Sequence, residues 1–257
     1  MINKEVEVSG IKIHYRTFGK GQPVLVLPGW GQSSECFTNL EQYSNLDLEF
    51  YILDLPGFGK SGTPDFIWNY SDYADFLEKF CKQMDMLNPA ILGHSFGAKV
   101  GYFLAKKVGT KKFIIYSSCL SGDKSLFKIL NILLIKVFYF VLPNHLFYMH
   151  CKYLHPHTYE NFYIYDKIRA KRMLRIYMNL NFKRPIDDKS LVDTDLLIMF
   201  GKKDKISNCK FPQDLGLVKN KKVVMFENSG HFAHISETDK FVKNLRDFMK
   251  SDILCVI

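Results

Sequence analysis

The sequence lacks the features that mark several common classes of protein. Its six cysteines are scattered and no two form a C-x-x-C pair, so they predict free thiols rather than a zinc site or a disulfide framework. The first residues, MINKEVEVSG, lack the basic segment, the apolar core and the small-residue cleavage site of a signal peptide. These absences predict a cytoplasmic protein without a structural metal ion.

Long apolar runs and known nucleic-acid motifs are also missing. The strongest candidate for a membrane span, residues 126–142, has 17 residues before Pro143 and includes two lysines. A transmembrane helix needs roughly 20 predominantly apolar residues, so none is predicted, although the apolar and basic stretch 124–142 leaves contact with a membrane surface open. No internal repeat, low-complexity tract or nucleic-acid-binding motif occurs, so nucleic acid is not an expected partner.

Positive charge is concentrated in one segment. The chain carries a net charge of +9, and residues 123–184 hold 11 lysines and arginines against 3 acidic residues, which leaves the rest of the chain close to neutral. A basic segment attracts acidic partners in general, including acidic proteins and anionic lipids. The charge alone does not choose among these partners.

Eight short apolar runs divide the chain. The first two alternate in period two and meet at Gly10, which predicts a hairpin, and the other six are continuous, as in strands covered on both faces. The runs occupy residues 6–10, 11–19, 23–31, 50–59, 89–97, 112–118, 196–204 and 222–230. With 257 residues, of which 47% are hydrophobic, the chain is long enough to bury one sizeable core around such a sheet.

Amphipathic helices are predicted between these runs, at residues 70–87, 95–109 and 236–250. The last of them opens with a capping-box pattern, Ser236 with Asp239. The first places on one stripe the side chains of Tyr73, Phe76, Leu77, Phe80, Met84 and Leu87. Alternating strands and helices predict an α/β fold with a mostly parallel sheet of about eight strands and right-handed crossovers.

Residues 121–185 interrupt this alternation. They contain LFKILNILLIKVFYFVLP, a stretch rich in histidine and tyrosine, and the basic sequence YDKIRAKRMLRIYMNL, but no strand–turn–helix unit. We therefore predict a helical lid inserted into a single core, which is formed by residues 1–120 and 186–257.

The pentapeptide GHSFG, residues 93–97, ends a predicted strand and opens a predicted helix. This strand–turn–helix context is the one in which a G-x-S-x-G sequence presents its serine as a nucleophile. Gly93 and Gly97 are expected to be small because larger side chains would collide with neighbouring backbone. The N-terminus of the following helix would favour negative charge developing on a substrate oxygen. Ser95 is therefore the candidate nucleophile.

A serine hydroxyl needs a base, and His231 follows the last predicted strand in ENSGHFAH. An imidazole that titrates near neutral pH takes the serine proton and returns it to the leaving group. Asp204, in MFGKKDKI after the preceding strand, is expected to fix the imidazole tautomer, with Asp123 as the alternative acid. The order Ser95, Asp204, His231 is the one expected for a nucleophile elbow of this type, and all three residues follow strand ends.

Two backbone N–H groups are expected to hold the oxyanion that forms when the serine attacks. One belongs to Phe96, directly after the nucleophile, and the other to Trp30, in the LPGWG loop after the third predicted strand. Gly29 and Gly31 would let this loop turn sharply toward the serine. Such a mechanism needs no metal ion and no organic cofactor.

Taken together, these segments resemble the α/β-hydrolase superfamily. PGWG, DLPGFGKS, GHSFG, GKKD and SGH occur in the order and at the spacing typical of that superfamily and extend over most of the chain. The superfamily usually has a histidine before Gly29, where this chain has Pro28, and the backbone donor does not depend on that side chain. The resemblance implies the triad already named. A serine nucleophile argues against the haloalkane dehalogenase and epoxide hydrolase branches, which use aspartate.

Within the superfamily, GWG, DLPGFGKS and the basic lid are similar to the carboxylesterases that demethylate pimeloyl acyl-carrier-protein methyl ester in biotin synthesis. This resemblance implies a serine carboxylesterase acting on a small-molecule acyl ester, with an acidic acyl carrier protein docking on the lid. The alternatives are a lipase or thioesterase, a C–C bond hydrolase of the same fold, and a catalytically silent binding module. The candidate substrate or partner contacts are Trp30, Phe138, Phe147, Tyr163, Arg169, Arg172 and Arg175.

Other polar residues near these motifs are predicted to be structural. Asp54 in DLPGFG is expected to brace its turn. His94 is expected to give packing or polar support because a second base is not required, and His234 is expected to support its loop. The histidines at positions 145, 150, 155 and 157 have a spacing that fits no zinc pattern, so metal binding is not expected.

Overall fold

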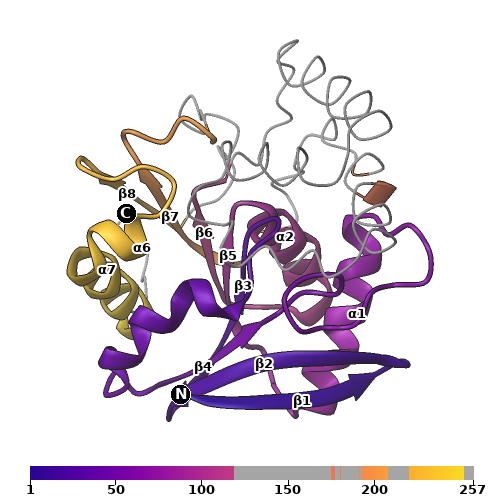
Figure 1. Cartoon of the computed structure of the whole chain (residues 1–257). Helices are drawn as coiled ribbons and strands as arrows, with labels where there is room; N and C mark the ends of the chain where they lie inside the picture. Colours follow the sequence, from indigo (N-terminus) through magenta and orange to yellow (C-terminus); the bar gives the residue numbers. More distant parts are fainter. Residues whose placement is uncertain (119–174, 177–179, 181–190, 192, 208–219, 252–257) are drawn as a thin grey trace, which may run out of the picture.

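A mixed sheet forms the centre of the part of the chain that the structure describes. This computed structural model describes residues 1–118, 175–176, 180, 191, 193–207 and 220–251. Eight strands lie in the order β1-β2-β4-β3-β5-β6-β7-β8 (Figure 1). They are β1 (Ile2–Val8), β2 (Ile11–Gly19), β3 (Gln22–Leu27), β4 (Leu48–Leu53), β5 (Ala90–His94), β6 (Lys112–Tyr116), β7 (Asp195–Gly201) and β8 (Lys221–Phe226).

The sheet is parallel except at one edge. β1 pairs antiparallel with β2, and β2 pairs antiparallel with β4. Every pairing from β4 through β3 to β8 is parallel. The predicted eight-stranded, mostly parallel sheet with an N-terminal hairpin is confirmed. The loops that leave β3, β4, β5, β6, β7 and β8 therefore gather at one edge, where α/β sheets carry their binding sites.

Helices cover both faces of the sheet. α1 (Tyr70–Gln83) and α2 (Phe96–Val108) lie on one face, while the 3-10 helix η1 (Ser34–Tyr43) and α7 (Thr238–Lys250) lie on the other (Figure 1). A single-turn helix, α6 (Ala233–Ser236), precedes α7. The apolar runs are continuous because both faces of the sheet are buried. In β3, Leu25 packs into the core beside α1 and α2, and its neighbour Val26 packs into the core beside η1 and α7.

α1 ends before the predicted apolar stripe does. The helix stops at Gln83, and Asp85 has a φ of 50°, in the left-handed region that ends helical geometry. Leu87, predicted to face the core, is 87% exposed, so the expected extension to residue 87 is wrong. Buried residues of the stripe are Tyr73, Phe76, Leu77 and Phe80.

The capping box predicted at Ser236 is also wrong. Ser236 belongs to the last turn of α6, where its hydroxyl contacts Ser229 Oγ at 2.7 Å, and α7 begins two residues later at Thr238. A capping box is present instead at α1, where the Asn69 side chain accepts two backbone N–H groups and Asp72 accepts the Asn69 N–H at 2.7 Å.

The predicted lid falls mainly outside the described residues, so the boundaries 1–120, 121–185 and 186–257 stay predictions. Of this segment, Ile176 and Leu180 are described, and both are buried in the core on the α1 and α2 face. Within the described part of the chain, no helix has the length and apolar character needed to cross a membrane. The stretch 124–142 lies outside that part.

Candidate active site

Ser95 occupies a strained turn between β5 and α2. Its backbone has a φ of 53° and a ψ of −110°, a combination that non-glycine residues rarely adopt. Such strain costs of order 1–3 kcal/mol and persists where surrounding contacts hold it, as the hydrogen bond from the Ser95 N–H to the Tyr116 carbonyl (2.8 Å) does here. Ser95 is the N-cap of α2, yet its hydroxyl makes no capping bond. The hydroxyl is therefore not committed to the helix.

Two glycines allow the backbone to pass closely around this turn. A Cβ on Gly93 would lie 2.4 Å from the Ala98 Cα, and a Cβ on Gly97 would lie 2.0 Å from the Leu27 carbonyl oxygen. Real Cβ atoms do not come so close to backbone, so the expectation that both positions must be small is confirmed. Gly97 also brings the first turn of α2 against the end of β3, where the LPGWG loop begins.

Asp204 and His231 form a buried pair beyond the ends of β7 and β8. His231 Nδ1 lies 2.8 Å from Asp204 Oδ2, and the other carboxylate oxygen accepts the N–H groups of Ile206 (2.8 Å) and Ser207 (2.9 Å). Burial would raise the pKa of Asp204, but the bond from His231 and these two backbone bonds hold it below its ordinary value. The ionised carboxylate keeps a proton on Nδ1, which leaves Nε2 as the acceptor that a general base needs.

Serines at the end of β6 connect the elbow to the loop after β7. The Ser118 hydroxyl donates to the Ser95 carbonyl at 2.8 Å, and the Ser207 hydroxyl donates to the Ser117 carbonyl at 2.6 Å. Ser117 has a φ of 45°, so the chain bends sharply between these two contacts. These serines were not predicted, because no motif distinguishes them from other loop serines.

The LPGWG loop lies directly against the elbow. Gly31 has a φ of 74°, as the predicted sharp turn requires. The Trp30 ring packs edge-to-face on Phe96, with ring centroids 5.2 Å apart, and on Phe58 at 4.9 Å. The two residues expected to supply oxyanion donors therefore touch through their side chains, and aromatic pairs of this geometry add about 0.5–1.5 kcal/mol beyond burial.

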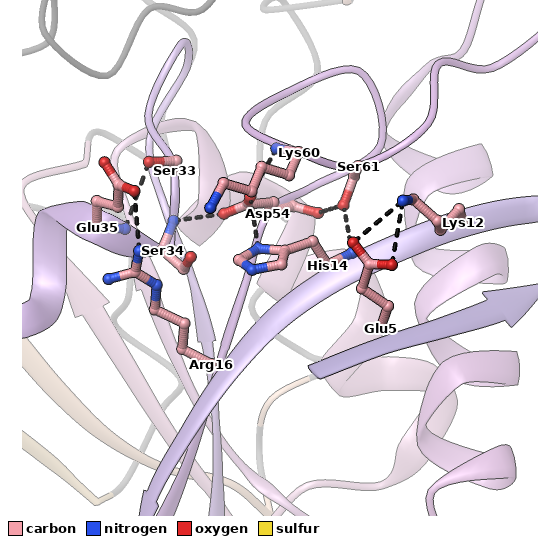
Figure 2. Close-up of polar contacts among 10 residues, drawn as sticks. All are labelled: Glu5, Lys12, His14, Arg16, Ser33, Ser34, Glu35, Asp54, Lys60 and Ser61. Carbon is pink, nitrogen blue, oxygen red and sulfur yellow. Dashed lines mark hydrogen bonds and ion pairs between the residues drawn. The ribbon is translucent and has the colours of Figure 1, made fainter. Parts of the chain in front are cut away.

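Asp54 braces the neighbouring loops, as expected. Figure 2 shows its carboxylate between His14 of β2, Ser34 at the start of η1 and Lys60 of its own loop. His14 Nδ1 lies 2.9 Å from Oδ2, the Lys60 N–H donates to Oδ2 at 2.7 Å, and the Ser34 N–H donates to Oδ1 at 2.6 Å. Burial would raise the pKa of Asp54, but these bonds hold it below its usual value. A buried ionised carboxylate thus ties three segments together.

His94 gives polar support behind the candidate nucleophile, in agreement with the sequence expectation. Its ring is fully buried and lies 4.6 Å, centroid to centroid, from the His231 ring. His94 Nδ1 is 2.9 Å from Gln32 Oε1, and Nε2 is 3.0 Å from the His231 carbonyl oxygen. Burial and the neighbouring His231 and His234 lower the pKa of His94 well below 6.5. Gln32 was not predicted, because its partner lies 62 positions along the chain.

His234 supports its loop from the other side. Its Nδ1 lies 2.9 Å from the Tyr116 hydroxyl, and its Nε2 lies 2.9 Å from the Cys36 carbonyl. Burial lowers the pKa of His234 to about 4, although the bond to Cys36 acts in the opposite direction. The Tyr116 hydroxyl also lies 3.2 Å from the His231 carbonyl oxygen, so one buried group of polar contacts surrounds the backbone of the His231 loop.

Several predicted contact residues fall outside the described part of the chain. They are Phe138, Phe147, Tyr163, Arg169 and Arg172, together with the alternative acid Asp123 and the four lid histidines. Arg175 is described and its side chain is exposed. Within the described ranges, no group of three or more histidine, cysteine, aspartate or glutamate residues is arranged to hold a metal ion.

Comparison with known proteins is consistent with this arrangement. Residues 24–244 match the model of the alpha/beta hydrolase family, so the chain belongs to that family. Among curated proteins, it is similar to the pimeloyl-[acyl-carrier protein] methyl ester esterase of Aliivibrio fischeri strain MJ11. The two are 22% identical over 264 residues, which cover 92% of this chain and 97% of that protein. The chain is therefore a hydrolase of the α/β class.

Shorter matches and solved structures agree on the fold. The 2-hydroxy-6-oxo-6-(2'-aminophenyl)hexa-2,4-dienoic acid hydrolase of Metapseudomonas resinovorans is 29% identical over 104 residues, covering 39% of this chain and 36% of that protein. An esterase from Exiguobacterium antarcticum superposes with a TM-score of 0.73 at 20% identity, covering 97% of this chain and all of that chain. A bromoperoxidase from Bacillus anthracis gives 0.78 at 20% identity, with the same coverage of both chains. At such identities the structures establish the shared fold alone.

Proposed function

We propose that the chain is a serine carboxylesterase that works through an acyl-enzyme. His231 Nε2 takes the proton from Ser95 Oγ as the oxygen attacks the ester carbonyl, and the carbonyl oxygen becomes an oxyanion. His231 then gives its proton to the leaving alcohol. A water molecule, deprotonated by His231, attacks the acyl-enzyme, and the acid leaves as the proton returns to Ser95 Oγ.

The observation that carries this proposal is the Asp204–His231 pair, set beside a serine in a strained elbow. The pair is short, at 2.8 Å, and buried, and the His231 ring packs on the residue directly before Ser95. An ionised carboxylate behind the imidazole stabilises the imidazolium that forms during attack. Each backbone donor to the oxyanion, here assigned to Trp30 and Phe96, would contribute roughly 2.7–4 kcal/mol.

Replacement of the nucleophile tests the mechanism. We expect Ser95→Ala to lower kcat for p-nitrophenyl acetate by at least about 10⁴-fold and to abolish labelling by a fluorophosphonate, since the proposed mechanism has no nucleophile without this hydroxyl. Ser71→Ala, in the first turn of α1, is the matched control and should retain both signals. Unchanged turnover in folded Ser95→Ala protein would refute the mechanism. Wild-type protein that neither hydrolyses esters nor reacts with the fluorophosphonate would favour a silent binding module.

For the substrate, we propose a methyl ester of an acyl chain carried on an acidic acyl carrier protein. The support is the similarity over nearly the full length to an esterase of that kind, together with the +8 balance of residues 123–184. A basic surface raises the rate of encounter with an acidic partner by electrostatic steering. The methyl ester of a pimeloyl chain carried on the acyl carrier protein is the first substrate to test.

Charge reversal separates carrier docking from simple ester hydrolysis. The triple change of Arg169, Arg172 and Arg175 to Glu is expected to lower kcat/KM for pimeloyl-carrier methyl ester by at least about tenfold, with the loss shrinking as salt is added. Turnover of p-nitrophenyl acetate should stay within about twofold, because a small neutral ester gains nothing from steering. Equal losses on both substrates would count against docking, and rescue of a biotin auxotroph lacking this esterase gives an independent test.

Panels of substrates distinguish three other activities of the same fold. The match to a hydrolase of a ring-cleavage product covers only 39% of the chain, so C–C bond hydrolysis has weaker support than ester hydrolysis. Assay of a 2-hydroxy-6-oxo-dienoate beside esters and thioesters of increasing acyl length separates a C–C hydrolase, a thioesterase and a lipase. Liposome co-sedimentation tests contact of residues 124–142 with a membrane surface.

A further inference from the structure

Gln32 holds the loop that carries Trp30 by a bond within the loop itself. The Gln32 side chain is buried, and its Oε1 accepts the Gly29 N–H at 2.8 Å. The Gln32 N–H in turn donates to the Gly29 carbonyl at 3.1 Å. Both bonds fix the peptide groups next to Trp30, and the Gly29 N–H is engaged by the side chain rather than offered to a substrate.

The same oxygen also faces His94. Gln32 Oε1 lies 2.9 Å from His94 Nδ1, and the other ring nitrogen of His94 lies 3.0 Å from the His231 carbonyl oxygen. His94 itself lies in β5, one residue before Ser95, so the ring spans from the Trp30 loop to the His231 loop behind the nucleophile. The chain of contacts runs through buried groups only, which shields it from exchange with water.

The groups around Gln32 and His94 determine which of their atoms donate hydrogen bonds and which accept them. Oε1 must be an acceptor because it receives the Gly29 N–H, and the His231 carbonyl can only accept, so both nitrogens of His94 face acceptors. A neutral imidazole has one N–H and donates to one of them at a time. Rotation of the Gln32 amide would set its NH₂ group against the Gly29 N–H, which fixes the orientation as given. The Gln32–Gly29 bond therefore holds the loop whichever nitrogen of His94 carries the proton.

We propose that Gln32 is a positioning residue that keeps the Trp30 backbone N–H aimed at the oxyanion, with the buried His94 ring lying between that loop and the His231 loop. The inference rests on the proposed esterase function. Because the oxyanion exists only after attack, loss of this positioning affects the transition state more than the bound ester. The signature is a fall in kcat with little change in KM.

Gln32→Met tests the proposal, because methionine has nearly the same shape but lacks the amide oxygen. We expect kcat for p-nitrophenyl acetate, per active site titrated with a fluorophosphonate, to fall about tenfold while KM stays within twofold. The Ki of an acyl trifluoromethyl ketone, whose hemiketal oxygen occupies the oxyanion position, should rise by a similar factor. Gln32→Asn, one methylene too short to reach both partners, should give a smaller loss in the same direction.

A control of equal burial separates positioning from a general loss of stability. Thr110→Val removes a buried hydrogen bond to the Pro89 carbonyl (2.5 Å) at the opposite end of β5 and β6. It should lower stability without changing kcat, KM or Ki per titrated site. The proposal is overturned if Gln32→Met leaves kcat and Ki within twofold of wild type, or if KM rises as much as kcat falls.

Nuclear magnetic resonance of the histidine ring nitrogens does not depend on ester hydrolysis, so it tests Gln32 independently of the proposed function. In ¹⁵N-histidine-labelled protein, Gln32→Met should shift the His94 Nδ1 resonance and Thr110→Val should not. Unchanged His94 resonances overturn the contact between Gln32 and His94 even if the wild type hydrolyses no ester. An active wild type with unaffected Gln32 variants overturns the positioning role and leaves the esterase proposal standing.

Discussion

The sheet carries two buried aspartate–histidine pairs, and they differ in what surrounds their histidines. Asp204 with His231 and Asp54 with His14 have the same contact, Nδ1 to Oδ2, at 2.8 and 2.9 Å. Burial would raise the pKa of each carboxylate, yet hydrogen bonds from the histidine and from backbone hold both below the ordinary value. The pair by itself therefore does not define a catalytic site.

The surroundings of the two histidines explain their different roles. His14 lies inside β2, where its N–H donates to the Ser61 hydroxyl at 2.9 Å and its carbonyl accepts the Asp54 N–H at 2.9 Å. Its Nε2 is buried and has no hydrogen-bond partner among the described residues. His231 lies on a loop beside the elbow, with its ring packed on His94, and its Nε2 is the base of the proposed mechanism. A strand makes the first pair a brace, and a loop at the strand ends makes the second pair suitable for proton transfer.

Removing the charge from the Asp204 pair should give the largest effect on activity. We expect Asp204→Asn to lower kcat for p-nitrophenyl acetate by about 10⁴-fold, because an amide no longer fixes the His231 tautomer or stabilises its charged form. Stopped-flow or steady-state hydrolysis measures the loss, and circular dichroism checks that the fold is kept. Activity within tenfold of wild type would show that another acid, such as Asp123, takes this part.

The same change in the Asp54 pair should instead destabilise the protein. Asp54→Asn replaces a buried carboxylate that accepts three hydrogen bonds, and breaking such a pair costs about 4 kcal/mol in the free energy of unfolding. Urea unfolding measures the loss. Turnover per titrated active site should stay within about fivefold of wild type, and a loss as large as that of Asp204→Asn would erase the distinction between the two pairs.

His234, a third buried histidine, has no carboxylate partner among the described residues, which distinguishes it from His14 and His231. Burial lowers the pKa of His234 to about 4, so the unfolded chain, with an ordinary histidine pKa near 6.5, binds this proton first as the pH falls. Above pH 6.5 the neutral, buried His234 costs the folded state no stability. As the pH falls toward 4, the free energy of unfolding decreases by about 3 kcal/mol, because the unfolded chain takes up a proton that the folded chain does not. The pKa of His94 is also lowered, so His94 adds to this loss of stability as the pH falls below 6.5.

The carboxylates act in a lower pH range. Their folded pKa values are lowered, so the stability that they contribute is present above the ordinary pKa of about 4 and is lost below it. We expect urea unfolding between pH 7 and 4 to show a smaller loss in His234→Gln than in wild type, by about 3 kcal/mol. Equal slopes in the two proteins over this range would contradict a neutral buried His234.

Much of the fold follows from the sequence because the strands must be apolar on both faces. Continuous runs such as that of β3 predicted the parallel sheet, and the motifs after the strand ends predicted where Asp204 and His231 meet. The errors lie at the ends of helices. Leu87 fits the helical stripe, but a left-handed Asp85 ends α1 first, and Ser236 fits a capping box, but α6 takes it into a separate turn.

The supports of the site were harder to predict than its reactive groups. Gln32, Ser118 and Ser207 act through single contacts between distant segments, and nothing in their neighbouring residues distinguishes them. Reactive groups are recognisable because chemistry demands particular side chains after particular strands. A positioning group needs only a hydrogen-bonding atom in the right place, and many residue types at many positions supply one.

The contact between His94 and the His231 carbonyl joins residues that are 137 positions apart, so the ribosome synthesises these two residues at different times. At about 5–20 residues per second, the ribosome adds the intervening chain over roughly 7–27 seconds. During that interval a nascent chain has the GHSFG turn but no His231. Because His231 follows β8, we expect the proposed base to reach the serine only after β8 has paired with β7. An amino-terminal fragment is therefore expected to carry an unactivated serine, so ester hydrolysis would report a completed sheet.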